Sequence, residues 1–371
     1  MTLGVTECNE GVMNILNVVY TFNSGGVERL VIDVSNRIVC QNQNSYVCIV
    51  SDKYSESLVR QFNHKVKLIF SKKKNRFRHI SFLLQLNKII RENHIQVMHV
   101  HEGNFMSFFL LLKIMNPSLK VFFTVHDTYI FSELSRKNRL IASFVCTKII
   151  AISDAVRADI LKNGVTQKKI IRIYNGVNFN RFDVEKRHKS ELPIILTNVA
   201  RFFPEKKGQD IFIRAAAILK SKGYDIKALF AGAPITNDGK AIKDMHKLCA
   251  DMGVEEIISF LGNIDDIPKL LEQTDIFVIP SRYEGFGIAA VEALAMGIPC
   301  VASDIEGLNE VVNSSELGEV FAAGDEKELA DKLEYVINYL HTYNPLLISE
   351  NIKKRFSIES MVEQLITIYN T

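Results

Sequence analysis

Short apolar or β-branched runs alternate with segments of helical period along almost the whole sequence. This alternation is typical of parallel sheets built from βαβ units, so it restricts the chain to the α/β class. In the first half, we expect strands at 14–20, 45–50, 67–70, 97–100, 120–124 and 148–151, and helices at 27–39, 80–92, 105–113 and 153–161. In the second half, we expect strands at 193–200, 227–231, 257–260, 276–280 and 299–302, and helices at 208–221, 240–252, 267–273, 288–296 and 327–340.

A polar stretch, DVEKRHKSE at 183–191, interrupts this rhythm and is the candidate interdomain linker, which we place at 183–192. It divides the chain into one Rossmann-like domain at 1–182 and another at 193–355. In open α/β sheets, ligands bind at the carboxyl ends of the strands. Two such domains would therefore face each other across a shared cleft.

Composition narrows the possible classes of protein. A chain of 371 residues is long enough for two cores, and its formal net charge of +3 does not favour nucleic acid as a partner. The six cysteines are scattered singly, with no CxxC pair and no zinc spacing, so we expect free thiols in a reducing compartment. No secretory signal is visible at the start, and the apolar run at 105–115 falls short of the roughly 20 residues that span a bilayer.

The strongest single motif lies at 275–297, where a buried-type strand, a loop and a glycine-led helix succeed one another. Glu284 lies in the loop and Glu292 inside the helix, and the loop continues as Gly285, Phe286, Gly287 and Ile288. The glycines permit close backbone approach, and the free N–H groups at a helix start suit a phosphate. The carboxylates suit hydroxyl groups of a sugar or a ribose. The alternative is a purely structural role, in which the glycines form a turn and Glu292 is a solvated helix residue.

The same segment also matches a GxGxxA dinucleotide fingerprint, with Asp304 where a ribose-binding acid would stand. That match would indicate an oxidoreductase. However, residues 281–284 separate the strand from the first glycine, whereas the fingerprint turn is tight.

A basic loop follows the strand that opens the second domain, in NVARFFPEKKGQD at 198–210. Arg201 offers a fork of donors and Lys207 a point charge, and together they suit a diphosphate that leaves during a reaction. The alternative is a solvated basic loop before a helix.

Two further candidates lie in the first domain. Gly25 and Gly26 follow the first strand and open a helix, which would provide backbone donors at the cleft. His126 ends a strand at the same edge, where it could hydrogen-bond a transferring sugar, although a single histidine is more often structural.

Taken together, these segments resemble the retaining GT-B glycosyltransferases of family GT4, of the bacterial surface-polysaccharide type, along nearly the whole chain. The markers are GGVE at 25–28, TVHD at 124–127, AISDAV at 151–156, IYNGVN at 173–178, the R…KKG loop at 201–208 and the E-x7-E from Glu284 to Glu292. The ordered set is far more specific than any one member.

The resemblance implies a role for each candidate. Arg201 and Lys207 would hold the donor diphosphate, Glu284 the hydroxyls of the donor sugar, and Glu292 the ribose. His126 would lie beside the 6-position of the sugar, and Gly25 and Gly26 beside the diphosphate. The base would be held around Asn263 and Ile264, next to the loop from Gly285 to Ile288. Family members place the lysine five or six residues after the arginine, which leaves Lys206 as an alternative; we choose Lys207 because it directly precedes Gly208.

The resemblance also implies the reaction. The first domain would bind the acceptor and the second a nucleotide-sugar, with UDP-sugar favoured and GDP-mannose next, and the C-terminal helix at about 356–371 would pack back on the first domain. Because the sequence has no Asp-x-Asp motif, we expect neither a metal nor another cofactor. We expect transfer of a hexose, with retained configuration, to a lipid-linked saccharide in O-antigen or capsule biosynthesis.

The basic run in the first domain bears on where the protein binds its acceptor and where it lies in the cell. The basic run at 72–79 leads into an apolar-faced segment and suits an anionic membrane surface, or is simply a solvated loop. We therefore expect a cytoplasmic protein that can lie peripherally on the cytoplasmic face of the inner membrane. A nucleotide-sugar epimerase, an NAD-dependent oxidoreductase and a catalytically silent sugar-binding protein remain as alternatives.

Overall fold

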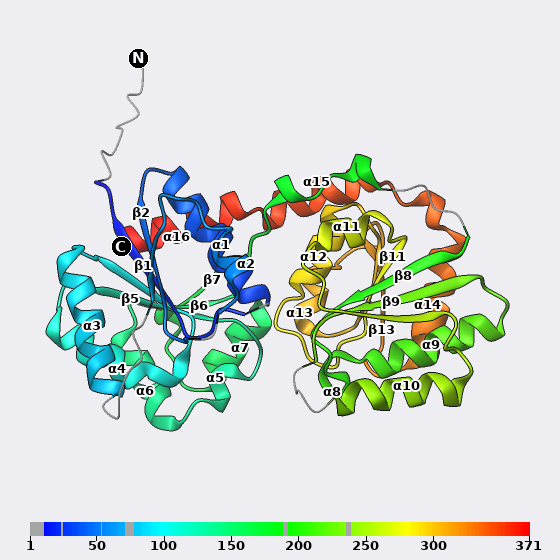
Figure 1. The fold of residues 1–371 in the computed structure, drawn as a ribbon, viewed down its shortest axis with the longest axis horizontal. Coiled ribbons are helices and arrows are strands. Elements are labelled where there is room, and N and C mark those ends of the chain that lie inside the picture. The colour runs from blue at the N-terminus through cyan, green and yellow to red at the C-terminus, as the bar shows by residue number, and fades with distance from the viewer. Residues whose placement is uncertain (1–10, 24, 53, 71–77, 188–191, 235–238) are drawn as a thin grey trace, which may run out of the picture.

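The chain forms two α/β domains that lie side by side in the computed structural model (Figure 1). The structure describes residues 11–23, 25–52, 54–70, 78–187, 192–234 and 239–371. Each domain is built around one parallel sheet, as the alternation of strand and helix patterns predicts.

The first domain has a seven-stranded sheet in the order β3-β2-β1-β4-β5-β6-β7. Its strands are β1 (Asn14–Val19), β2 (Asn44–Ile49), β3 (Lys67–Phe70), β4 (Val97–Val100), β5 (Lys120–Val125), β6 (Lys148–Ala151) and β7 (Ile170–Arg172). Its helices are α1 (Gly26–Cys40), α2 (Glu56–Val59), α3 (Arg78–Glu92), α4 (Met106–Met115), α5 (Ile130–Glu133), α6 (Arg136–Val145) and α7 (Asp154–Lys162). The strand order reverses between β1 and β4, so the loops after these two strands flank the switch point.

The second domain has a six-stranded sheet in the order β10-β9-β8-β11-β12-β13. Its strands are β8 (Ile194–Val199), β9 (Ile226–Ala231), β10 (Ile258–Gly262), β11 (Ile276–Ile279), β12 (Cys300–Ser303) and β13 (Gly318–Phe321). Its helices are α8 (Pro204–Lys207), α9 (Gln209–Ser221), α10 (Lys240–Met252), α11 (Ile267–Glu272), α12 (Ile288–Ala295), α13 (Glu306–Asn309), α14 (Glu326–Asn338) and α15 (Pro345–Phe356). Here the order reverses between β8 and β11.

The chain crosses between the domains twice, and the two crossings are hydrogen-bonded to each other. Val177 donates its N–H to the carbonyl of Phe356 at 2.9 Å and accepts from the N–H of Ile358 at 3.0 Å. A Cβ atom on Gly176 would lie 2.6 Å from the Cα atom of Ile358, so this close approach requires glycine. The crossings therefore form one double-stranded connection.

The last helix, α16 (Ile358–Asn370), returns to the first domain, where Figure 1 shows it beside α1. Its apolar face packs into a buried cluster with residues of the first sheet and of α1; Met361, Val362, Leu365 and Tyr369 are the helix residues at the centre of that cluster. The C-terminal segment thus ties the two domains together.

Several elements lie outside the sequence expectation. The helix α6 and the strands β7 and β13 are not among the predicted elements, because they are short or begin with polar residues. Among the described residues, Cys40, Cys48, Cys146, Cys249 and Cys300 are free thiols, and Cys8 lies outside that set. In the described part of the chain, no helix is both long and apolar enough to cross a bilayer.

Candidate active site

Two loops at the carboxyl edge of the second sheet form the centre of the site. The loop at 200–208 follows β8 and the loop at 280–287 follows β11, on the two sides of the switch point. Arg282 joins them: its guanidinium donates to both carboxylate oxygens of Asp210 at 2.8 Å and to the carbonyl of Pro204 at 2.8 Å. Neither Arg282 nor Asp210 is among the predicted site residues. A two-pronged Arg–carboxylate pair fixes geometry well, so it sets how the two loops lie against each other.

Lys207 and Glu284 meet between these loops. The ammonium Nζ of Lys207 lies 2.6 Å from Oε2 of Glu284, and the Ser281 hydroxyl donates to the same oxygen at 3.2 Å. Both side chains are largely shielded from solvent, with 18% and 15% of their surface exposed. The structure therefore brings together a cation and a carboxylate that were predicted from segments 77 residues apart.

The neighbouring lysine points elsewhere. Lys206 pairs with the carboxylate of Asp127, which belongs to the loop after β5 in the first domain. Gly285 approaches the same residue so closely that a Cβ atom on it would lie 2.7 Å from the Cα atom of Asp127. Tyr129 and Tyr283 add an edge-to-face contact, with ring centroids 5.8 Å apart. The two domains are thus in direct contact at this side of the cleft.

Arg201 faces the glycine pair of the first domain. A Cβ atom on Gly25 would lie 2.8 Å from Nη2 of Arg201, and one on Gly26 would lie 3.4 Å from Cγ2 of Ile288. The start of α1 in the first domain therefore lies next to the start of α12 in the second domain. Glu28, in the first turn of α1, is buried; burial raises its pKa, and Arg201 acts in the opposite direction. The carboxylate of Glu28 lies between the start of α1 and the guanidinium of Arg201 and accepts backbone hydrogen bonds there. The start of α12 is therefore the helix start that suits a phosphate.

Glu292 is not a solvated helix residue. Burial raises the pKa of its carboxyl, and the guanidinium groups of Arg181 and Arg29 partly offset that rise. Arg29 lies on α1 and Arg181 in the 3₁₀ turn η3 (Phe179–Arg181), so Glu292 interacts with charges from the first domain and from the crossing. Neither arginine is among the predicted site residues.

The remaining predicted donor residues lie around these groups. Asn263 and Ile264 follow β10, and β9 separates that strand from β8, so they lie farther out along the sheet edge. Asn263 is exposed, and Ile264 packs on a small cluster with Leu229 and Leu270. Phe286 directs its ring away from the cleft, because it stacks on Tyr174 at 5.4 Å and contacts Phe356 edge-on at 5.2 Å. Only its main chain is placed to meet a ligand.

His126 follows β5 and directly precedes Asp127. Its Nε2 lies 2.8 Å from Nδ1 of His101, and its own Nδ1 is buried with no hydrogen-bond partner among the described residues. Burial lowers the pKa of His126 to about 4, so the ring is neutral near pH 7; the nearby carboxylate of Asp127 acts in the opposite direction. His101 is not among the predicted site residues, although the pattern HVH at 99–101 places two histidines on one side of a strand end.

The dinucleotide alternative does not fit this geometry. Eight residues, 280–287, separate β11 from α12, so the turn is not tight, and Gly285 packs on Asp127 of the other domain. Asp304, the proposed ribose-binding acid, accepts a hydrogen bond from the side chain of Asn309 at 2.6 Å.

Comparison with known proteins decides the family. The family described as Glycosyltransferase Family 4 matches residues 24–181, and the one described as Glycosyl transferases group 1 matches residues 179–344. The two matches follow each other without a gap and cover both domains. The chain is a family 4 glycosyltransferase.

The relatives described next are distant from this glycosyltransferase in sequence. The capsular polysaccharide biosynthesis glycosyltransferase CapM of Staphylococcus aureus is 28% identical over 62% of this chain, and the match spans 63% of that relative's length. A UDP-Gal:α-D-GlcNAc-diphosphoundecaprenol α-1,3-galactosyltransferase of Escherichia coli is 26% identical over 62% of this chain and 64% of its own. The crystal structure of HepE of Anabaena in complex with UDP and glucose has a TM-score of 0.82 at 20% identity, over 97% of this chain and 100% of that one. The fold of this glycosyltransferase is therefore GT-B.

Proposed function

We propose that this glycosyltransferase moves a hexose from a nucleotide-diphosphate sugar to a saccharide acceptor in the biosynthesis of a bacterial surface polysaccharide, either O-antigen or capsule. A UDP-sugar is the donor that we favour, and GDP-mannose is next. The observation that carries the proposal is the grouping of Arg201, Lys207 and Glu284 at the switch point of the second sheet, opposite the glycine-led start of α1. The CapM relative, which acts in capsule biosynthesis, supports the choice of pathway.

Each charged group has a task in this reaction. When the bond from C1 of the sugar to the diphosphate breaks, its electron pair goes to the phosphate oxygen, and Arg201, Lys207 and the start of α12 stabilise that negative charge. Glu284 holds hydroxyls of the sugar, and Glu292 holds the ribose. Because these cationic groups and helix starts supply the charge stabilisation, we propose transfer without a metal ion, which persistence of activity in EDTA would test.

The resemblance to retaining enzymes supports attack on the same face of the sugar. The acceptor oxygen bonds to C1 on the side from which the diphosphate leaves, and the acceptor proton passes to the leaving phosphate. NMR of the anomeric signal of the product tests this proposal, because an inverted configuration would exclude it.

Donor binding is tested first by thermal shift with UDP-, GDP- and ADP-sugars, and with NAD(H) and NADP(H). We expect one nucleotide-sugar to stabilise the protein by about 2–3 kcal/mol at a concentration near 100 times its dissociation constant. Arg201→Ala should abolish most of that stabilisation, because it removes a diphosphate contact. Stabilisation by NAD(H) alone would reject the proposal, and so would equal stabilisation of the variant.

We further propose that the acceptor is lipid-linked and that the protein binds an anionic membrane peripherally from the cytoplasm. The E. coli relative, named for a diphosphoundecaprenol acceptor, supports the first part. The basic run at 72–79 lies outside the residues whose side chains the structure describes. Next to each other on the first domain, however, α4 and α6 expose Ile114, Leu140 and Phe144, with 65%, 64% and 78% of their surface in solvent. Neither helix has an acidic residue.

Sedimentation with anionic liposomes tests this membrane contact. We expect less bound protein when the lysines and arginines of the 72–79 run become glutamine, or when Ile114 and Phe144 become serine. The matched control is Leu346→Ser with Leu347→Ser, two similarly exposed apolar residues on α15 of the other domain. Unchanged sedimentation of both test variants would reject membrane binding.

A further inference from the structure

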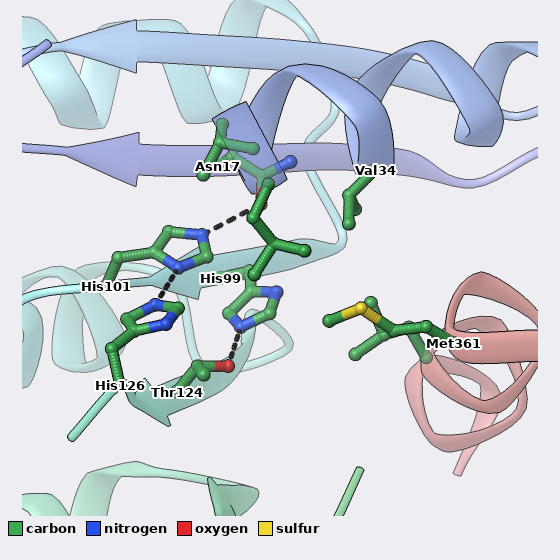
Figure 2. A pocket seen from close by; sticks show the side chains of 10 residues that line it. Asn17, Val34, His99, His101, Thr124, His126 and Met361 are labelled. Atoms are coloured by element: carbon green, nitrogen blue, oxygen red, sulfur yellow. Dashed lines mark hydrogen bonds between the residues drawn. The ribbon is translucent and has the colours of Figure 1, made fainter. Parts of the chain in front are cut away.

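A row of three histidine rings runs from the buried C-terminal helix to His126, which follows β5 and directly precedes Asp127 (Figure 2). His99 and His101 stack with ring centroids 4.5 Å apart, and His101 and His126 stack at 5.1 Å. His99 is fixed by hydrogen bonds of 2.6 Å to the hydroxyl groups of Tyr369 and Thr124. The resemblance to family 4 gives a role in sugar binding to His126 alone. It does not explain why His99 and His101 stack behind that ring.

The hydrogen bonds give this row a direction. With the amide of Asn17 oriented so that Oδ1 faces the ring, Nε2 of His101, 3.3 Å away, donates to that oxygen and so carries the hydrogen. A neutral imidazole has one N–H, so Nδ1 of His101 carries a lone pair. Nε2 of His126, 2.8 Å away, must then donate to it. The hydrogen of His126 is therefore on Nε2, and its Nδ1 is an acceptor.

The surroundings keep the rings in this neutral state. The small cavity beside them is lined by apolar residues of α1 and α16 and by no charged side chain; its lining is Asn17, Leu30, Val31, Val34, His99, His101, Thr124, His126, Met361 and Leu365. Burial lowers the pKa of His101 well below its usual value and that of His99 to about 3. Protonated rings, which would have two donors each, are thus not populated near pH 7.

We propose that Asn17 and His101 are positioning residues that hold His126 in the tautomer whose Nδ1 accepts a hydrogen bond from a hydroxyl group of the donor sugar. Nδ1 of His126 is buried without a partner among the described residues, and a buried polar atom left unpaired is costly unless a ligand completes it. This inference rests on the proposed function, because it assumes that the donor is a sugar nucleotide. It adds the two residues that decide whether His126 offers an acceptor or a donor.

The first test is NMR of the protein with ¹⁵N-labelled histidine, in which protonated and unprotonated ring nitrogens have well-separated shifts. His126 is assigned by its loss in His126→Gln. We expect Nε2 of His126 to be protonated and Nδ1 to be unprotonated, and in His101→Leu we expect a mixture of both tautomers. A protonated Nδ1 in the unaltered protein would overturn the proposal, because it would mean that the amide of Asn17 is turned and the whole row is reversed. An unchanged tautomer in His101→Leu would overturn it as well.

The second test compares His101→Leu with His101→Asn, two side chains of similar size, of which only asparagine can accept from Nε2 of His126. The probes are UDP-glucose, UDP-galactose and GDP-mannose, each measured against UDP or GDP alone. For the sugar nucleotide that binds, we expect His101→Leu to lower affinity in proportion to the fraction of His126 that keeps the accepting tautomer, roughly fivefold if that fraction is about one in five, with less than a twofold change for the free nucleotide. His101→Asn should recover most of the loss.

Equal losses for the sugar nucleotide and the free nucleotide would indicate general damage to the fold and would overturn the positioning role. If no sugar nucleotide of the wider UDP-, GDP- and ADP-sugar panel binds to the unaltered protein, the proposed function fails, while the NMR result still decides the tautomer.

Discussion

Lys207→Ala is expected to lower the turnover of sugar transfer by about 10²–10³-fold, whereas Lys206→Ala is expected to lower it by less than about tenfold. The two lysines are adjacent in sequence and have the same chemistry. Their environments differ, because Lys207 lies 2.6 Å from Glu284 in the proposed donor site, and Lys206 pairs with Asp127 of the other domain.

The difference follows from where charge develops. A cation that faces the leaving diphosphate is more useful as the C1–O bond breaks than before, so its loss reduces turnover. Alanine at 207 also leaves Glu284 without its cation in a site that is mostly shielded from water. A pair such as Lys206–Asp127, about a quarter exposed, is worth on the order of 1 kcal/mol, which corresponds to a modest effect on how often the domains are closed.

Single-turnover rates with saturating donor separate the two effects, and circular dichroism shows whether each variant is folded. A larger loss in Lys206→Ala than in Lys207→Ala would mean that Lys206, and not Lys207, is the diphosphate ligand. Equal and small losses in both variants would mean that neither lysine acts in the chemical step.

Local patterns were enough to predict much of this fold. The strands β1 to β6 and β8 to β12 and the glycine-led start of α12 were expected because apolar runs and turn residues signal them within a few positions. The helix α6 was missed because its first turn is basic and polar, and because exposed Leu140 and Phe144 alternate with buried Ala142 and Val145 and so obscure the buried stripe in the sequence. The strand β13 is only four residues long and includes Glu319.

The candidate site, too, could be predicted only in part from the sequence. Arg201, Lys207, Glu284 and Glu292 each stand in a recognisable segment, but the sequence does not say which of two adjacent lysines meets which carboxylate. That depends on the register of α8 against the loop after β11, which Arg282 and Asp210 fix. Contacts between the domains, such as Gly285 with Asp127, join residues 158 positions apart and leave no local pattern.

Gly208→Ala is expected to destabilise the second domain by about 3–4 kcal/mol, against about 1 kcal/mol for Gly223→Ala. Both glycines have positive φ, 68° at Gly208 and 86° at Gly223, so alanine is strained at either position. They differ in the space around them. A Cβ atom on Gly223 would meet nothing within 4 Å, whereas one on Gly208 would overlap the carbonyl oxygen of Pro280 and lie 2.8 Å from its carbon.

The position of Gly208 connects this strain to the site. It ends α8 and precedes α9, so it holds Lys207 against the strand end from which the loop carrying Glu284 departs. Relief of the overlap requires the loop after β8 to move away from β11, which would separate Lys207 from Glu284. Thermal unfolding of the two variants tests this, at roughly 2–4 °C per kcal/mol for a domain of this size, together with donor affinity. Equal losses of stability in both variants would show that backbone strain alone, and not the close approach to Pro280, makes glycine necessary at 208.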